Sequence, residues 1–138
     1  MRDLFGNEIS DKMSGKDFEK LIAKILKENK CLVAEQVDIG IKFNNKRHII
    51  DILVNGNILI SIKWQYTGGT AEEKVVYEMG TLQDKINFNG YKKAFVILGG
   101  PGWTIFENLK RYSKLFPEVT LTRYEDDKTL SFIKNEIK

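Results

Sequence analysis

Two kinds of hydrophobic spacing alternate along the chain, and the first is helical. Residues 15 to about 29 carry apolar side chains at intervals of three and four positions, which predicts an amphipathic helix. Ser14 precedes this segment and Asp17 follows three residues later, a pair that can cap the first turn. The apolar stripe comprises Phe18, Leu21, Ile22, Ile25 and Leu26.

The second kind of spacing consists of short apolar runs that predict strands. These runs lie at 31–43, 47–54 and 58–65, and the last two flank a turn at 55–57. The run at 92–100 is almost unbroken, which is typical of a strand covered on both faces of its sheet.

The rest of the chain alternates in the same way. We expect a helix over 70–87, another over 104–116, a short strand over 118–124 and a closing helix over 128–138. The resulting order, α-β-β-β-α-β-α-β-α, predicts an α/β fold with a mixed central sheet flanked by helices.

Composition narrows the class of protein only slightly. A chain of 138 residues with 42% hydrophobic and 30% charged residues fits one soluble globular domain, residues 1–138. The net charge of +3 is compatible with a nucleic-acid partner without pointing to one.

Cys31 is the one cysteine, so an internal disulfide is excluded and a reducing compartment is expected. Without a long apolar run or a signal-peptide pattern, we expect a cytoplasmic protein and no membrane partner.

One carboxylate interrupts the apolar pattern of the second strand. Asp51 has apolar neighbours on both sides in the sequence, so a covered sheet would offer it little room without an ionic partner. A structural ion pair with Lys63, without any catalytic chemistry, is one explanation. A functional site is the other.

The length of the turn decides between these explanations. A two-residue loop at 55–56 would turn Asp51 away from Ser61 and Lys63. A three-residue loop at 55–57 would pair Asp51 with Ser61 and put Lys63 on the same face. The asparagine that ends the longer loop tolerates the left-handed conformation expected there, so we predict the three-residue register. A site formed by Asp51 and Lys63 requires that they not point to opposite faces.

The order of elements and charged residues resembles a known family. A helix with Glu19, a strand with Asp51, a hairpin, Ser61-Ile62-Lys63, and then a helix and a strand are similar to the PD-(D/E)xK nuclease superfamily. The resemblance covers about residues 14–100. The stretches "IKWQ" and "GGTAEEKV" resemble a subgroup in which glutamine follows the motif lysine and a Gly-Thr turn opens an acidic helix. It implies a restriction-endonuclease-like αβββαβ core with a C-terminal α-β-α extension.

The resemblance also implies a site for metal-dependent hydrolysis of phosphodiesters. Asp51 and the backbone carbonyl of Ile62 would bind Mg²⁺, for which Mn²⁺ can substitute, because Mg²⁺ prefers hard oxygen ligands. Lys63 would stabilise developing negative charge or orient the attacking water, and Gln65 would orient water or phosphate. Glu19 matches a first-helix glutamate that reaches the metal through water. A solvated helix-flank residue is the alternative for Glu19.

Ser61 departs from this pattern, because the superfamily has Asp or Glu there. Three explanations are open: the acidic residue of the motif has moved to another position in the chain, the chain is inactive, or the serine is an engineered change. One branch of restriction enzymes with serine here takes its carboxylate from the following helix. Glu78, fifteen positions after Lys63, lies about 70° from the middle of that helix's apolar stripe, and Glu72 lies about 50° away on the other side. We therefore expect Glu78 to be catalytic and to bind the metal, with Glu72 in reserve, although both could simply flank the core.

DNA is the expected partner. Gly69 allows close approach of the backbone, Thr70 opens a helix whose free N–H groups suit a phosphate, and Lys74 lies in its first turn. A solvated Lys74 is the alternative, and His48 is expected at the surface.

The sequence thus predicts a metal-dependent DNA endonuclease, restriction-like or junction-resolving. We expect a homodimer, since a duplex has two strands to cut. One alternative is a DNA-binding or structural module whose metal site is lost at Ser61. Another is an enzyme acting on RNA or a small molecule with the same fold.

Overall fold

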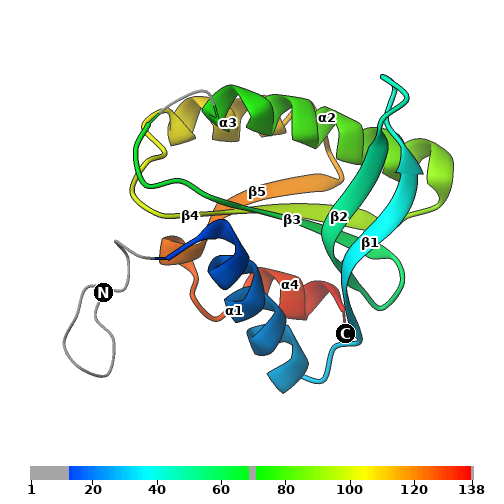
Figure 1. Cartoon of the computed structure of the whole chain (residues 1–138), viewed down its shortest axis with the longest axis horizontal. Coiled ribbons are helices and arrows are strands. Elements are labelled where there is room, and N and C mark those ends of the chain that lie inside the picture. The colour runs from blue at the N-terminus through cyan, green and yellow to red at the C-terminus, as the bar shows by residue number, and fades with distance from the viewer. Residues whose placement is uncertain (1–12, 69–70, 138) are drawn as a thin grey trace.

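A five-stranded mixed sheet forms the centre of the protein, which is described by a computed structural model over residues 13–68 and 71–137 (Figure 1). The strand order follows the sequence, β1-β2-β3-β4-β5. β1, β2 and β3 pair antiparallel, whereas β3, β4 and β5 pair parallel. The strands are β1 (Val33–Ile41), β2 (Arg47–Val54), β3 (Ile58–Trp64), β4 (Lys93–Gly99) and β5 (Val119–Arg123).

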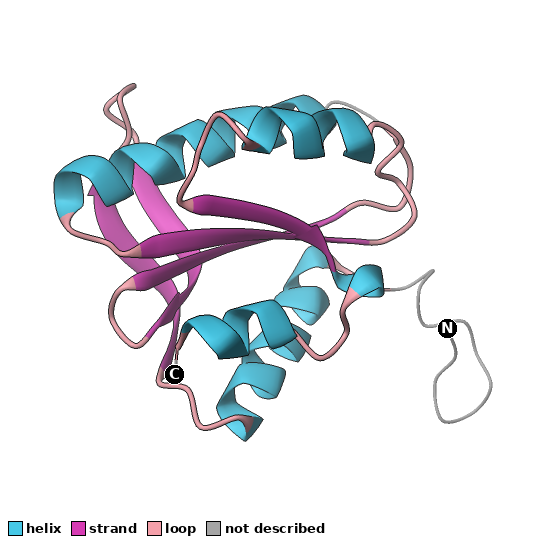
Figure 2. Cartoon of the chain, turned by 180° about the vertical axis from the view of Figure 1, so that it is seen from behind, coloured by secondary structure: helices cyan, strands magenta, loops and turns pink. Residues whose placement is uncertain are grey.

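Helices cover both faces of this sheet. Figures 1 and 2 show α1 and α4 on one face and α2 and α3 on the other. The helices are α1 (Gly15–Glu28), α2 (Ala71–Asn89), α3 (Phe106–Ser113) and α4 (Ser131–Glu136), with a 3₁₀ helix η1 (Tyr124–Asp126) after β5. The predicted α/β class and order of elements are confirmed, and η1 was not predicted. Within the described ranges, no helix combines the length and apolar character needed to cross a bilayer.

Each covering layer has its own hydrophobic core. On the α1 face, Phe18, Ile22 and Leu26 pack against the sheet, as the helical stripe predicts. Val75, Met79 and Leu82 do the same for α2 on the opposite face. The predicted cap of α1 is also present, because the amide of Asp17 donates to Ser14 Oγ at 3.1 Å and the Ser14 amide donates to Asp17 at 3.3 Å.

The turn between β2 and β3 has the predicted length. Val54 pairs with Ile58, and the amide of Asn57 donates to the carbonyl of Val54 at 3.2 Å. The predicted position of the left-handed residue was wrong. Asn55 (φ 53°) and Gly56 (φ 75°) adopt positive φ, and the closing Asn57 does not. Asparagine and glycine are the residues that tolerate this conformation best, so the loop still closes without strain on a bulkier side chain.

The β1–β2 hairpin changes faces halfway along its length. Ile52 packs in the α1-side core, whereas Ile50 packs in the α2-side core, although regular alternation would put both on one face. The change falls at Asp51 and at the adjacent Gln36 of β1, whose φ is 52°. The β2–β3 pairing extends from Val54 only as far as Ile52, so the two strands separate at Asp51. This separation creates the place where the candidate site lies.

Candidate active site

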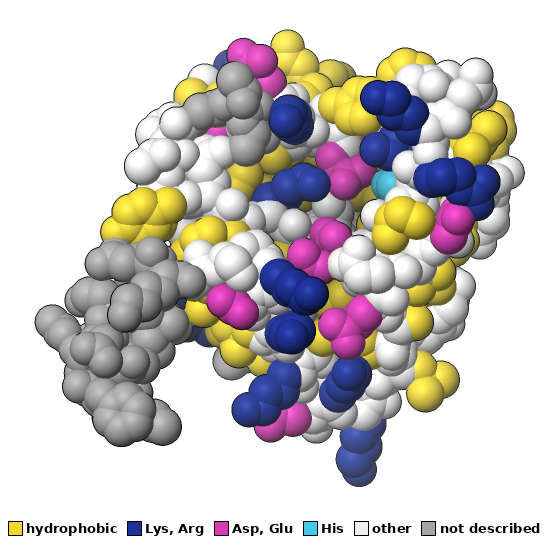
Figure 3. All heavy atoms as spheres, in the orientation of Figure 1, with side chains coloured by type: hydrophobic (Ala, Val, Ile, Leu, Met, Phe, Trp, Pro, Cys, Tyr) yellow, Lys and Arg dark blue, Asp and Glu magenta, His cyan; other side chains and the backbone are white. Residues whose placement is uncertain are grey.

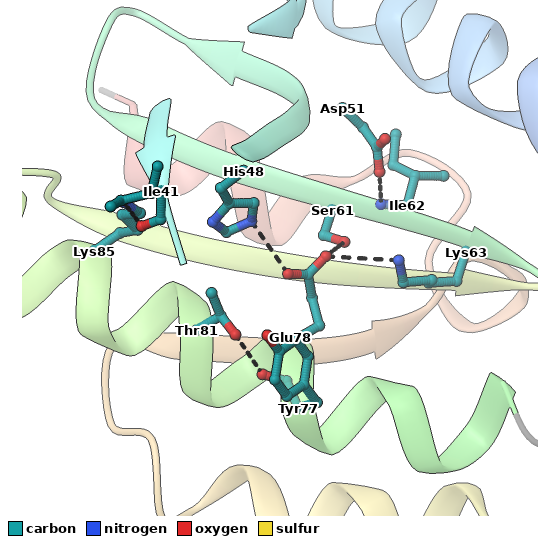
Figure 4. Close-up of polar contacts among 10 residues, drawn as sticks. All are labelled: Ile41, His48, Asp51, Ser61, Ile62, Lys63, Tyr77, Glu78, Thr81 and Lys85. Carbon is teal, nitrogen blue, oxygen red and sulfur yellow. Dashed lines mark hydrogen bonds and ion pairs between the residues drawn. The ribbon is translucent and has the colours of Figure 1, made fainter. Parts of the chain in front are cut away.

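The centre of the candidate site is the opening between Asp51 on β2 and Ile62 on β3, which we call the β2–β3 fork. Asp51 Oδ2 accepts a hydrogen bond from the amide of Ile62 at 2.7 Å (Figure 4). The carboxylate therefore takes the place of the backbone partner that a continuing ladder would supply. Because the N–H and C=O of a strand residue leave the backbone on the same edge, the Ile62 carbonyl also faces the fork.

Asp51 does not occupy this position by simple strand alternation. The expected pair with Ser61 is not formed, because the ladder ends one pair earlier, at Ile52 and Ile60. The alternation that placed Asp51 on the face of Lys63 is interrupted by the change of faces in β2. Asp51 contacts the Ile62 amide and Glu19 of α1, whereas Lys63 lies beside Glu78 of α2, so the predicted common face is not formed. The two residues nevertheless act on each other across the fork, since the charge of Lys63 opposes the rise in the pKa of Asp51.

A second carboxylate reaches the fork from α1. Burial, and then the neighbouring Asp51 carboxylate with which it shares a hydrogen bond, raise the pKa of Glu19 to about 6. The side-chain amide of Gln36 donates from Nε2 to Glu19 Oε1 at 2.5 Å and so connects α1 to the β1–β2 hairpin. The pKa of Asp51 is raised as well, chiefly by burial. The structure thus brings Glu19 and Asp51 together as a pair whose negative charge is only partly compensated.

Ser61 is adjacent to a carboxylate from α2. Ser61 Oγ donates to Glu78 Oε2 at 2.8 Å, and Lys63 Nζ lies 3.6 Å from the same oxygen (Figure 4). Ser61 is fully buried, so this contact is shielded from water. The helix after β3 therefore places Glu78 beside the position where the superfamily has an acid, as the sequence predicts.

His48 completes this second group, and its expected surface position was wrong. Its side chain is 3% exposed, and its Nε2 lies 3.3 Å from Glu78 Oε1. Burial alone would raise the pKa of Glu78, but contacts with His48, Lys63 and Ser61 outweigh it and lower the pKa to about 2. The sequence did carry a signal for the burial of His48, because it is two residues from the core residue Ile50 on the same strand.

Two candidates from the sequence make contacts elsewhere. Gln65 Nε2 donates to the carbonyl of Gly102 at 2.7 Å, so its amide holds the loop after β4. Glu72 accepts hydrogen bonds from the backbone amides of Thr104 and Ile105, the latter at 3.3 Å, just before α3. The structure therefore does not bring the Gln65 amide nitrogen or the reserve acid Glu72 to the fork.

The predicted DNA contacts are only partly described. Gly69 and Thr70 lie outside the described residues. Lys74 is exposed in the first turn of α2. Its exposure agrees with either a solvated lysine or a contact with an anion.

The donor chemistry at the fork fits a divalent cation. No group of three or more His, Cys, Asp or Glu side chains is arranged to hold a metal in ranges 13–68 and 71–137. Mg²⁺, however, is commonly held by one or two carboxylates while water fills its other positions. Asp51, Glu19 and the carbonyl of Ile62 provide such a donor set. Glu78 would have to leave its present partners to join it.

Fold and site together define a class of protein. A mixed sheet with an αβββαβ core, an aspartate where β2 leaves β3 and a lysine on β3 are the features of a restriction-endonuclease-like fold. The family model for the PD-(D/E)XK nuclease superfamily domain matches residues 2–123. The chain belongs to this superfamily.

A solved structure shares the fold. The crystal structure of a protein of unknown function, AF1548, is similar to this chain with a TM-score of 0.54 and 17% sequence identity. The similarity covers 78% of this chain but 56% of the other, so the chain spans little more than half the length of that neighbour. No curated protein matches the sequence.

Proposed function

We propose that this protein is a metal-dependent endonuclease that hydrolyses phosphodiester bonds in DNA. The observation that carries the proposal is the β2–β3 fork, where two carboxylates with raised pKa, Asp51 and Glu19, lie near Lys63. Membership of a nuclease superfamily supports the reaction class. Excess negative charge next to a lysine suits a site that takes up a cation and a phosphate together.

The residues at the fork have distinct roles in this proposal. Asp51, Glu19 and the Ile62 carbonyl would hold Mg²⁺ or Mn²⁺, which supplies a Lewis acid for the phosphate and its attacking water. Lys63 Nζ stabilises the negative charge that develops on the phosphate oxygens. Asp51 keeps its orientation through the Ile62 amide, and Gln36 orients Glu19.

Glu78 supplies the negative charge that Ser61 lacks. Its carboxylate lies 2.8 Å from Ser61 Oγ, next to the motif position that is acidic in the superfamily. Its contacts support a role in holding Lys63 in place, 3.6 Å away, more directly than the predicted role as a metal ligand. Either role favours an active site over one that was lost at Ser61.

Cleavage assays on plasmid and branched-junction DNA with Mg²⁺ test the proposal. We expect wild-type protein to cut and Asp51→Asn to lose about 10³-fold in rate. Asp84→Asn is the matched control, because Asp84 is an exposed acid on α2. Cleavage by Asp51→Asn at the wild-type rate would rule out the mechanism.

The same assay tests the alternative of a degraded, DNA-binding module. That alternative predicts no cleavage by wild type and a gain of activity in Ser61→Glu. We expect the opposite, because a second carboxylate at the fully buried position 61 would repel Glu78 and displace it.

We also propose that the enzyme acts as a homodimer, with one site for each strand of the duplex. Light scattering gives the oligomeric state, and the ratio of nicked to linear plasmid reports whether both strands are cut in one encounter. A monomer that only nicks would contradict this part of the proposal.

The single cysteine, Cys31, is buried, which suits the reducing cytoplasm in which we expect the enzyme to act.

A further inference from the structure

The β1–β2 hairpin ends in a strongly basic tip. Residues 42–47, which we call the basic tip, contain Lys42, Lys46 and Arg47 and no acidic residue. Figure 1 shows the hairpin rising past α2, away from the body of the molecule. Phe43 at its end is 78% exposed, so its ring is available to a partner that approaches the tip.

The basic tip is braced against α2. Lys85, a buried lysine of α2, donates from Nζ to the carbonyl of Ile41 at 2.7 Å. The ring of Tyr77 lies 5.4 Å from that of Phe43, and Lys42 Nζ lies 5.9 Å from the centre of the Tyr77 ring. These contacts fix the direction of the hairpin relative to the sheet, so its cations have a defined position relative to the fork.

β2 connects the basic tip directly to the candidate site. Arg47 is four residues from Asp51, a rise of about 13 Å along an extended strand. That distance corresponds to about four base-pair steps of a DNA strand. Arg47 keeps its direction through hydrogen bonds from its guanidinium to Asp38 Oδ2, one of them at 2.9 Å. Phosphates on either side of a bond cut at the fork would therefore lie within reach of the tip.

The other side of the fork is basic as well. Lys16 and Lys20 of α1, which we call the α1 lysine flank, are exposed and lie about 60° and about 100° around the helix from Glu19. Figure 3 shows Lys and Arg side chains over the hairpin and along α1, with acidic side chains between them. Glu19 lies on α1 with the α1 lysine flank, and Asp51 lies on β2 with Arg47, so the carboxylates of the candidate site are next to both groups of cations.

We infer that the basic tip and the α1 lysine flank are two phosphate-binding arms that hold duplex DNA across the fork. This inference rests on the proposed function, because it assigns the surface that presents DNA to that site. A duplex fits better than a single strand, since a two-stranded β ribbon has the width of the major groove and the tip is braced as a rigid unit. Phe43 then contacts bases or sugars inside the groove, while Lys42 and Lys46 contact its phosphate edges.

Three charge-removing double variants test the two arms. Lys42→Gln/Lys46→Gln removes the tip cations, and Lys16→Gln/Lys20→Gln removes the flank. The matched control is Lys92→Gln/Lys114→Gln, which removes the same charge from exposed lysines that belong to neither arm. Affinity for a duplex of about 20 base pairs is measured with Ca²⁺ in place of Mg²⁺, from about 50 to about 200 mM salt.

Each arm variant should bind the duplex about tenfold more weakly at low salt, and its salt slope should fall by about one for each phosphate that it no longer neutralises. The control should match wild type. If the arm variants behave like the control while wild type still cuts DNA, the inference is wrong and the proposed function stands. If wild type never cuts but the arm variants lose duplex binding, the surface stands and the nuclease proposal fails.

Phe43→Ser separates DNA from a protein partner at the tip. It should weaken duplex binding about threefold without changing the salt slope, because it removes an apolar side chain but no charge. A change in oligomeric state with unchanged DNA affinity would assign Phe43 to a protein interface and overturn its place in the inference.

Discussion

The candidate site contains two groups of residues, the Asp51–Glu19 pair at the fork and Glu78 with its partners. They differ in how the charge of their carboxylates is balanced. Asp51 and Glu19 lie against each other, and the pKa of each is raised, that of Glu19 to about 6. Glu78 is also largely buried, yet His48, Lys63 and Ser61 lower its pKa to about 2. The difference comes from partners, because burial raises the pKa in all three cases.

This difference assigns separate tasks to the two groups. Glu78 already has its counter-charges in the protein, so it is suited to fixing the position of Lys63. Asp51 and Glu19 have too few, and a divalent cation would relieve their mutual repulsion. The site therefore combines a carboxylate whose charge the protein balances, Glu78, with a pair whose charge it leaves partly unbalanced, Asp51 and Glu19.

The largest expected effect is on stabilisation by metal. At a free Ca²⁺ or Mg²⁺ concentration of about 100 times its dissociation constant, binding to the native state should add about 2.7 kcal/mol to the free energy of unfolding. Asp51→Asn should lose this gain, because it removes a carboxylate of the unbalanced pair. Glu78→Gln should keep most of it. Urea denaturation with and without metal measures this gain in each variant. If Asp51→Asn and Glu78→Gln lose the same amount of stabilisation by metal, the proposed division of tasks is wrong.

Without metal the order of the two variants should reverse. Glu78→Gln should lower the free energy of unfolding by about 2 kcal/mol, since Lys63 and the buried His48 lose their carboxylate partner. Asp51→Asn should be neutral or stabilising, because it relieves the repulsion with Glu19. Urea denaturation in the presence of a chelator compares them. A more stable Glu78→Gln than Asp51→Asn would contradict the charge balance described above.

The sequence predicted the order of elements because apolar periodicity is local. It also predicted the β2–β3 register, because a three-residue loop leaves one pairing for Val54 and Ile58. The change of faces at Asp51 was beyond such reasoning. It coincides with the positive φ of Gln36, a conformation that non-glycine residues seldom adopt and that no spacing signals.

The candidate site shows the same limit. Helical geometry directed attention to Glu78, and the structure places it beside Ser61. The resemblance implied that Gln65 orients water or phosphate, but β3 ends at Trp64 and the Gln65 side-chain amide donates to the carbonyl of Gly102 in a distant loop. Such tertiary contacts cannot be derived from the pattern of one segment.

The pH dependence of stability in metal-free buffer should separate the two groups further. The folded pKa of Glu19, about 6, exceeds its unfolded value of 4.5, so its contribution to stability falls as pH rises through this interval. The folded pKa of Glu78, about 2, lies below 4.5, so its contribution is complete above pH 4.5 and is lost as pH falls toward 2.

Single substitutions assign each limb of this profile. Glu19→Gln should remove the decline between about pH 4.5 and about pH 6 and leave the acid limb. Glu78→Gln should do the reverse. Denaturation curves at closely spaced pH values give the profiles, and Asp84→Asn, which changes an exposed acid of α2, should retain both limbs. A decline near pH 6 that persists in Glu19→Gln would show that another group causes it.

Ser61→Ala should have the smallest effect and is the finest test of the comparison. It removes one of three contacts of Glu78, the 2.8 Å hydrogen bond, while His48 and Lys63 remain within 3.3 Å and 3.6 Å. We therefore expect a loss of about 0.5 kcal/mol in stability and a few-fold loss in cleavage rate, with stabilisation by metal unchanged. If Ser61→Ala instead abolishes stabilisation by metal, the serine itself takes part in the metal site. The conclusion that Ser61 and Glu78 serve only to position Lys63 would then be wrong.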